Sequence, residues 1–284
     1  MQVDPLLSTV NGQIDNTINI VDRGLAYGDG VFETLLLCEG HLHCLDLHLD
    51  RLQKGLDALR IKFSRLDMEA QLERFLVLAD SRTLTAGLLK IIVSRGQGRG
   101  YAPQNHNVPT VVIALFPTPD YPENFQQRGV AATVCQHRLS NQNGLAGIKH
   151  LNRLDNVLAS MEVQDKNYTE GLLFDQQNHL VEAINRNIFI VQDSKLLTPI
   201  LDQAGVKGVI RQLIVDTIAP SLNIAAQEIF IDEEQLQAAD EVFLCNSVSK
   251  IWPVNRIDDQ TYLIGPVTRA IQKELDRQLS QQVI

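Results

Sequence analysis

The chain has 284 residues, of which 44% belong to the hydrophobic set and 21% are charged. This composition is that of an ordinary globular protein, and it excludes a disordered chain and a long coiled coil. The 25 Lys and Arg residues against 34 Asp and Glu residues give a net charge of −9, which argues against nucleic acid as the main partner.

The sequence shows no secretory or membrane-spanning pattern. The N-terminus lacks a basic region followed by an apolar one, and the longest uncharged apolar stretch, residues 108–119, is too short and too rich in proline to cross a bilayer. We therefore expect a cytoplasmic protein that has no membrane partner. Its cysteines form no CxxC pair and are expected to be reduced: Cys38, Cys44, Cys135 and Cys245.

The first half of the chain predicts short strands and then helices. Asn11-Gly12 and Tyr27-Gly28-Asp29-Gly30 are typical of hairpin turns, and the second stands directly before the apolar run 31–37. Leucines at spacings of three and four predict an amphipathic helix over residues 45–60. A second helix is expected at 67–78, and strands rich in Ile and Val at 88–93 and 108–116.

A proline-rich stretch divides the sequence. Proline fixes φ and removes a backbone donor, so we predict a linker at residues 118–124, between a smaller domain at 1–117 and a larger one at 125–284. The second half mixes predicted strands at 130–135, 170–174, 180–191 and 241–244 with predicted helices at 153–166, 207–219, 231–238 and 267–281. We therefore predict an α+β fold, with α and β mixed, in two domains that share a ligand cleft.

Two segments suggest sites that we interpret as structural. Residues 40–48 contain three His, a Cys and an Asp, all good metal ligands, but they straddle a predicted strand-to-helix junction where side chains point apart. We interpret this segment as a corner of the fold and predict no metal. Gly28-Asp29-Gly30 is interpreted as a tight turn, because no Gly-Lys-Ser or GxGxxG pattern makes it a phosphate loop.

The loop from Arg95 to Tyr101 carries two arginines among three glycines. A planar guanidinium binds a carboxylate through two parallel hydrogen bonds, so Arg95 and Arg99 are candidates for holding an anionic substrate. A solvated hairpin tip explains this segment equally well.

Three later segments carry residues suited to catalysis or cofactor binding. Lys149 has apolar neighbours, which would desolvate its amine, lower its pKa and free it to attack a carbonyl; spacing alone favours a surface lysine. Glu182 lies in an apolar strand, where it would keep a ring nitrogen protonated or pair with Arg186 on the surface. The glycines of residues 205–211 precede a predicted helix whose first N–H groups would bind phosphate, or they form a plain turn.

Several strips of sequence, taken in chain order, match one family. They are Asp22-Arg23-Gly24 and residues 27–34, 48–52, 182–189 and 205–211. Together they resemble the class IV aminotransferase family, the pyridoxal phosphate enzymes of fold type IV, over nearly the whole chain. The resemblance implies the two-domain architecture of the D-amino-acid aminotransferases and a homodimer whose partner subunit closes part of the active site.

The resemblance also implies a role for each candidate residue. Lys149 forms the Schiff base with pyridoxal 5′-phosphate and acts as the catalytic base, Arg51 binds the phosphate group and Glu182 pairs with the pyridine nitrogen. The resemblance implies further cofactor contacts. Val206 packs on the face of the ring. The N–H groups of Val209 and Ile210 at a helix start and the hydroxyl of Ser247 bind the phosphate.

Within the family, residues 94–101 and 147–154 look most like the aminodeoxychorismate lyase subgroup, which releases 4-aminobenzoate and pyruvate for folate synthesis. This resemblance implies a small-molecule substrate, aminodeoxychorismate, whose contacts we assign to Arg95, Arg99, Thr34 and Tyr101. A D-amino-acid or branched-chain aminotransferase on the same fold is the alternative, although the former usually carries histidine where this chain has Gln97. A non-catalytic pyridoxal phosphate binder is a third hypothesis.

Overall fold

The computed structural model describes residues 4–104, 108–166 and 168–281. The chain divides into two compact units, of which the first contains the residues up to Asp120 together with the segment Ile148–Asn152. The second unit contains Tyr121–Gly147 and Arg153–Gln281. Lys149 therefore lies in the first unit, whereas our predicted division placed it in the second. The physical reason is that its segment pairs with a strand of the first unit.

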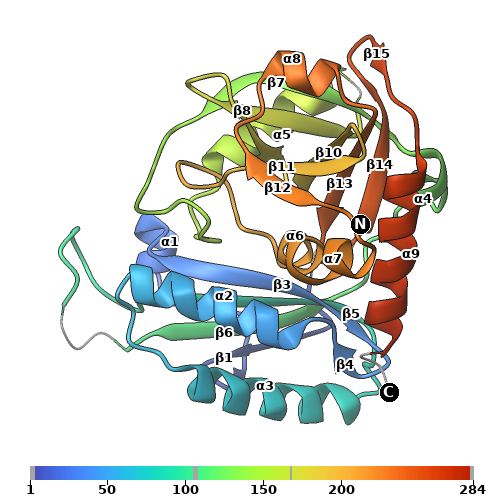
Figure 1. Ribbon diagram of the computed structural model, residues 1–284. Helices are drawn as coiled ribbons and strands as arrows, with labels where there is room; N and C mark the ends of the chain where they lie inside the picture. Colours follow the sequence, from blue (N-terminus) through green and yellow to red (C-terminus); the bar gives the residue numbers. More distant parts are fainter. Residues whose placement is uncertain (1–3, 105–107, 167, 282–284) are drawn as a thin grey trace. The chain divides into compact units, whose positions relative to one another are not determined.

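The first unit is built on an antiparallel sheet with the strand order β2-β1-β6-β5-β3-β4 (Figure 1). Its strands are β1 Leu7–Val10, β2 Gln13–Ile14, β3 Gly30–Cys38, β4 His41–Leu42, β5 Gly87–Ser94 and β6 Thr110–Phe116. Its helices are α1 Arg23–Tyr27, α2 Leu45–Ala58 and α3 Arg65–Asp80.

The core of the first unit lies between one face of this sheet and two helices. Alternate residues of the central strands, such as Leu35, Ile91 and Ile113, are buried and belong to one apolar cluster with Leu52 of α2 and Phe75 of α3. The period of two in the strands and the three-to-four spacing in the helices therefore direct their apolar side chains to a shared core.

One of the two predicted hairpins is confirmed and the other is wrong. Asn11 and Gly12 have φ of 51° and 77° and join β1 to β2. Residues 27–30 instead end a helix: Asp22 caps α1 by accepting a hydrogen bond from the Gly24 N–H, and Gly28 ends α1 with φ of 64°. A left-handed glycine serves both structures, so the local sequence did not distinguish them.

The second unit contains a mixed sheet with the strand order β12-β11-β10-β13-β14-β7-β8-β9, to which β15 adds beside β14 (Figure 1). The strands are β7 Val130–Leu139, β8 Glu170–Asp175, β9 Leu180–Ala183, β10 Asn187–Gln192, β11 Lys195–Pro199, β12 Ala226–Ile229, β13 Glu241–Asn246, β14 Lys250–Ile257 and β15 Gln260–Thr261. The helices are α4 Asn124–Arg128, α5 Leu154–Lys166, α6 Val209–Leu213, a π-helical turn Ile214–Ile218, α7 Ala219–Ser221, α8 Glu233–Gln237 and α9 Pro266–Gln281.

The predicted single strand at 180–191 is wrong. The chain forms β9 and β10 separately, and between them the Ala183 N–H donates to the Arg186 carbonyl at 2.8 Å. Both strands are buried on both faces, so the apolar run gave no period that would reveal the turn. The predicted helix at 207–219 corresponds to α6, the π-helical turn and α7 in succession. The predicted α+β class, with α and β mixed, is confirmed.

None of the described helices is long and apolar enough to cross a membrane.

Candidate active site

Lys149 is carried by a short segment that pairs with β3 of the first unit. The Phe32 N–H donates to the Lys149 carbonyl at 2.9 Å, and the Leu151 N–H donates to the Gly30 carbonyl at 3.0 Å. Val31 and His150 form the bridge between these two bonds. The segment therefore behaves as a short antiparallel addition to β3, which fixes the backbone of Lys149.

The Lys149 amine lies over an aromatic ring. Its Nζ is 4.4 Å from the centroid of the Phe32 ring. Phe32 and Thr34 are half-buried on the face of β3 opposite to the core. The structure thus places the predicted residues Lys149 and Thr34 on the same unit, with Phe32 in contact with the amine.

Arg51 of α2 is held by a carboxylate from the neighbouring strand. Glu33 accepts hydrogen bonds from Arg51 Nε at 2.7 Å and from Nη2 at 2.5 Å. His48, one helical turn before Arg51, places its Nδ1 2.6 Å from the same carboxylate. Glu33 and His48 are both fully buried, so this network fixes the plane of the Arg51 guanidinium.

Burial and the mutual interactions of Glu33, His48 and Arg51 determine which of these groups are charged. Burial alone would raise the pKa of Glu33, but Arg51 and His48 outweigh burial and lower that pKa to about 2. Burial lowers the pKa of His48, against the opposing effect of Glu33, and the nearby Arg51 and Lys149 lower it further. At neutral pH the network therefore contains an ionised Glu33 and a neutral His48.

The two arginines of the loop 95–101 differ in their environments. Arg95 donates to both carboxylate oxygens of Asp29, at 2.8 and 3.0 Å, and to the carbonyls of Leu59 and Arg60. Arg99 is exposed, and no residue in the described parts of the chain pairs with its guanidinium. In this structure the Arg95 guanidinium therefore pairs with a carboxylate of the protein itself. Arg99 keeps its donors for an anion.

Tyr101 is the last residue of this loop. Its side chain is 88% exposed, and its ring centroid lies 5.5 Å from that of Tyr27. Its carbonyl accepts a hydrogen bond from Arg23 Nη2 at 3.1 Å. Tyr101 thus stands beside Arg99 on the same exposed loop.

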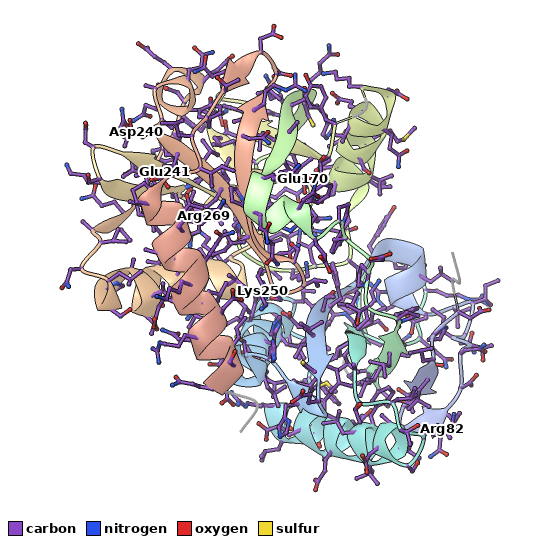
Figure 2. The ribbon with its side chains drawn as sticks, turned by 90° about the vertical axis from the view of Figure 1, so that its right-hand side faces the viewer. Arg82, Glu170, Asp240, Glu241, Lys250 and Arg269 are labelled. Carbon is purple, nitrogen blue, oxygen red and sulfur yellow. The ribbon has the colours of Figure 1, made fainter. Side chains whose placement is uncertain are left out.

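Glu182 lies in the second unit and is buried in β9. Its Oε2 accepts a hydrogen bond from the Val206 N–H at 2.8 Å. The alternative in which Glu182 is a surface residue paired with Arg186 is wrong, because Arg186 is itself buried and forms its ion pair with Glu170, which Figure 2 labels. The structure thus brings Glu182 and Val206, both predicted site residues, into direct contact.

The loop before α6 is fixed by backbone and side-chain contacts. Asn187 donates from Nδ2 to the Val206 carbonyl at 2.8 Å, so both polar groups of Val206 are bonded. A Cβ at Gly208 would lie 2.0 Å from Asn187 Oδ1, so a side chain at this position would displace Asn187. Val209 and Ile210 then form the first turn of α6, where N–H groups have no carbonyl of the same helix as acceptor.

Ser247 stands on the turn between β13 and β14, where it is half-buried. Ser249 on the same turn is buried, and its hydroxyl takes part in bonds with Arg186 and Asn246. Of these two serines, Ser247 is the more exposed.

Three residues of the networks within the two units, His48, Glu33 and Asn187, were not identified from the sequence. His48 and Arg51 are separated by three positions on a predicted helix, so their shared face was a usable signal. Glu33 alternates with Val31 and Leu35 on the core face of a strand, and a carboxylate at such a position needs a partner. Asn187 had no signal, because its partner Val206 lies 19 positions away along the chain.

Residues 40–48 form a strand-to-helix corner. They comprise β4, Cys44 with φ of 53°, and the start of α2. No group of three or more metal-binding side chains occurs within residues 4–104, 108–166 and 168–281.

Comparisons with known proteins define the class to which this architecture belongs. The family model Amino-transferase class IV matches residues 30–257. The chain belongs to the class IV aminotransferase family, as its motifs predict.

Individual relatives are similar over nearly their whole lengths. The chain is 35% identical over 275 residues to the aminodeoxychorismate lyase of Vibrio harveyi, covering 94% of this chain and 98% of that one. The solved 4-amino-4-deoxychorismate lyase from Pseudomonas aeruginosa is 39% identical with a TM-score of 0.91, covering 96% and 99%. The branched-chain amino acid aminotransferase from Escherichia coli is 25% identical with a TM-score of 0.89, covering 98% and 96%. These structures confirm the predicted fold type.

Proposed function

We propose that this protein is a pyridoxal phosphate-dependent lyase that converts 4-amino-4-deoxychorismate to 4-aminobenzoate and pyruvate, a step of folate biosynthesis. The observation that carries this proposal is the likeness to two lyases of that name, at 35% and 39% identity, over nearly the whole of each chain.

The residues of both units fit pyridoxal phosphate chemically. The Lys149 amine suits the aldehyde, the Arg51 guanidinium held by Glu33 suits the phosphate, and the buried Glu182 carboxylate suits the ring nitrogen. In this proposal all three act on one cofactor molecule. The helix-start N–H groups of Val209 and Ile210 and the Ser247 hydroxyl add donors to the phosphate, and Val206 covers the ring.

The reaction needs a base and a proton donor, and Lys149 supplies both. When bound, pyridoxal phosphate withdraws electrons from the carbon that bears the substrate's amino group. Lys149 Nζ removes the proton from that carbon, and the enolpyruvyl oxygen then leaves the neighbouring carbon, which makes the ring aromatic. Lys149 returns a proton to the departing pyruvate. Arg99 binds a substrate carboxylate, with Tyr101 and Thr34 as further substrate contacts.

The first test is a direct assay. Wild-type protein incubated with pyridoxal phosphate and aminodeoxychorismate is expected to release 4-aminobenzoate and pyruvate in equal amounts, and Lys149→Ala is expected to release neither. Borohydride reduction followed by peptide mass mapping should place a pyridoxyl group on Lys149. Labelling of Lys207 or any other lysine instead would overturn the assignment.

An aminotransferase is the second candidate, and the likeness to a branched-chain aminotransferase favours it. Transfer of an amino group from a D-amino acid or a branched-chain amino acid to a keto acid, without release of 4-aminobenzoate, would establish this alternative. Cofactor binding without either activity would show a non-catalytic binder.

A homodimer is part of the proposal, and α5 offers a surface for it. Four exposed apolar residues follow one side of this helix at spacings of three and four: Leu154, Val157, Leu158 and Met161. The buried residues Ala159 and Val163 face the core. An exposed apolar stripe of this kind marks an interaction surface, here with a second copy of the chain.

We also infer a cytoplasmic location, in keeping with the free thiols of the cysteines.

Light scattering tests the dimer. Wild-type protein is expected at about twice the 31.7 kDa mass of one chain, and Val157→Glu is expected to shift it toward one chain. Leu263→Glu, at an exposed apolar residue outside α5, serves as the control and should leave the mass unchanged. A single-chain mass for the wild type would contradict the proposal.

A further inference from the structure

Arg23 is a buried arginine to which the proposed site gives no role. It opens α1 and is 3% exposed. Its Nε donates to Asp29 Oδ2 at 2.8 Å, and its Nη1 and Nη2 donate to the carbonyls of Gly100 and Tyr101 at 2.6 and 3.1 Å. Each guanidinium nitrogen therefore has its own acceptor. Two of the three acceptors are consecutive carbonyls at the far end of the loop 95–101.

The near end of this loop is joined to the same carboxylate. Asp29 accepts hydrogen bonds from Arg95 Nε and Nη2, and its carbonyl accepts one from the Arg95 N–H at 3.0 Å. Burial would raise the pKa of Asp29, but the hydrogen bonds and charges of Arg95 and Arg23 hold that pKa below its usual range. An ionised Asp29 thus links the two arginines that hold the two ends of the loop.

Backbone bonds align the loop with the start of α1. The Arg23 N–H donates to the Gly96 carbonyl at 2.9 Å, and the Gly98 N–H donates to the Val21 carbonyl at 3.0 Å. Gly96 has φ of 87°, and a Cβ there would lie 1.9 Å from the Val108 carbonyl oxygen. These contacts therefore hold the backbone of residues 96–98 in one conformation beside residues 21–23.

Tyr27 binds the loop backbone on the C-terminal side of Arg99. Its hydroxyl accepts a hydrogen bond from the Gly100 N–H at 2.9 Å, and the Arg23 guanidinium lies 5.0 Å from its ring centroid. The backbone is thus fixed at Gly98 before Arg99 and at Gly100 after it. The Arg99 side chain itself is exposed and has no pairing partner among the residues the structure describes.

From this geometry we infer that Arg23 is a positioning residue that sets the place of Arg99 for binding a substrate carboxylate. The inference rests on the proposed function, in which the loop 95–101 contacts the substrate. An ordered loop presents Arg99 in one place, so less freedom is lost when an anion binds. The role requires a guanidinium, because a lysine amine at position 23 cannot reach a carboxylate and two carbonyls in three separate directions.

The experiment compares Arg23→Lys, Tyr27→Phe and a control, Arg82→Lys, at an exposed arginine labelled in Figure 2. With aminodeoxychorismate as the probe, Arg23→Lys is expected to raise KM roughly 10- to 100-fold and Tyr27→Phe roughly 3- to 10-fold, from the hydrogen bonds lost. In both variants kcat should stay within about threefold of wild type, since neither side chain acts in the chemical step. Arg82→Lys should match the wild type in KM and kcat.

A second readout follows the loop without any substrate. Trypsin cleaves after arginine only where the backbone opens locally and its hydrogen bonds break. Cleavage between Arg99 and Gly100 should therefore be faster in Arg23→Lys and Tyr27→Phe than in wild type. Mass spectrometry of the fragments measures it. Tyr27→Phe loses a single hydrogen bond, so it keeps the test valid if Arg23→Lys does not fold.

The outcomes separate this inference from the proposed function. If both variants keep the wild-type KM and the wild-type cleavage rate, the inference is overturned. A fall in kcat at unchanged KM also overturns it, because Arg23 would then act in another way. If wild-type protein releases no 4-aminobenzoate, the proposed function fails. The cleavage rates still decide whether Arg23 holds the loop.

Discussion

Glu33 and Arg51 form a two-pronged ion pair, with Nε to Oε1 at 2.7 Å and Nη2 to Oε2 at 2.5 Å. The residue before Glu33 on the same strand, Phe32, binds the Lys149 carbonyl through its N–H. Successive residues of β3 point to opposite faces, so one strand positions Arg51 with a side chain and Lys149 with its backbone. The two groups that we assign to the aldehyde and to the phosphate of the cofactor therefore depend on adjacent residues.

Replacing Glu33 with glutamine should make the position of the Arg51 guanidinium less well fixed. Glutamine keeps the shape but not the charge, so Arg51 loses its buried counter-ion and the neutral His48 loses a charged hydrogen-bond partner. We expect the Kd for pyridoxal phosphate to rise about tenfold or more and the free energy of unfolding to fall by about 3 kcal/mol. Fluorescence titration of the apoenzyme and urea denaturation measure these changes. Glu39→Gln, in the exposed turn after β3, is the control, and an unaltered Kd in Glu33→Gln would refute the role.

The same network should make stability depend on pH. The pKa of His48 lies below its ordinary value of 6.5 in the folded state, chiefly because of burial. As the pH falls below 6.5, the unfolded chain binds a proton at His48 that the folded chain does not, so the free energy of unfolding decreases. The pKa of Glu33, about 2 against an ordinary 4.5, adds a second loss as the pH falls from 4.5 toward 2.

Urea denaturation at a series of pH values between 8 and 5 measures the first of these losses. His48→Gln should reduce the slope of stability against pH over this range. His41→Gln, which changes an exposed histidine, is the control variant. A wild-type slope in His48→Gln would show that another group is responsible.

Asn187 should matter for cofactor binding although it is not assigned to contact the cofactor. It holds the Val206 carbonyl while Glu182 accepts from the Val206 N–H, so it fixes the peptide that Glu182 binds. Asn187→Ala leaves a buried carbonyl without its donor, and we expect cofactor affinity to fall roughly 5- to 10-fold. Cofactor titration measures the effect, with the exposed Asn141→Ala as control. Equal affinity in both variants would contradict this role.

The sequence predicted local periodicity well and long-range pairing poorly. The predicted helices at 45–60 and 153–166 closely match α2 and α5, because their apolar residues recur with the helical period. The prediction of a single strand over residues 180–191 was wrong, because strands that are buried on both faces show no alternation of polar and apolar residues. The environment of Arg95 depends on Asp29, 66 positions away, and the sequence does not show whether a guanidinium pairs with a substrate or with a carboxylate of the protein itself.

The two arginines of the loop 95–101 should respond differently to the same substitution. Arg95→Gln removes a half-buried partner of Asp29, which keeps its bond to Arg23, and we expect the free energy of unfolding to fall by about 1 to 2 kcal/mol. Arg99→Gln changes an exposed side chain, so stability should stay within about 0.5 kcal/mol of wild type. Its KM for aminodeoxychorismate should nevertheless rise roughly 10- to 100-fold, because a charged hydrogen-bonding partner of the substrate is lost.

Urea denaturation and steady-state kinetics on the same protein samples separate the two effects. Arg95→Gln is also expected to raise KM, since the loop loses its attachment, but only together with the loss of stability. If Arg99→Gln keeps the wild-type KM, the substrate carboxylate is bound elsewhere. If Arg95→Gln keeps the wild-type stability while its KM rises, then Arg95 acts on the substrate directly, and the structural role that its bonds to Asp29 indicate is wrong.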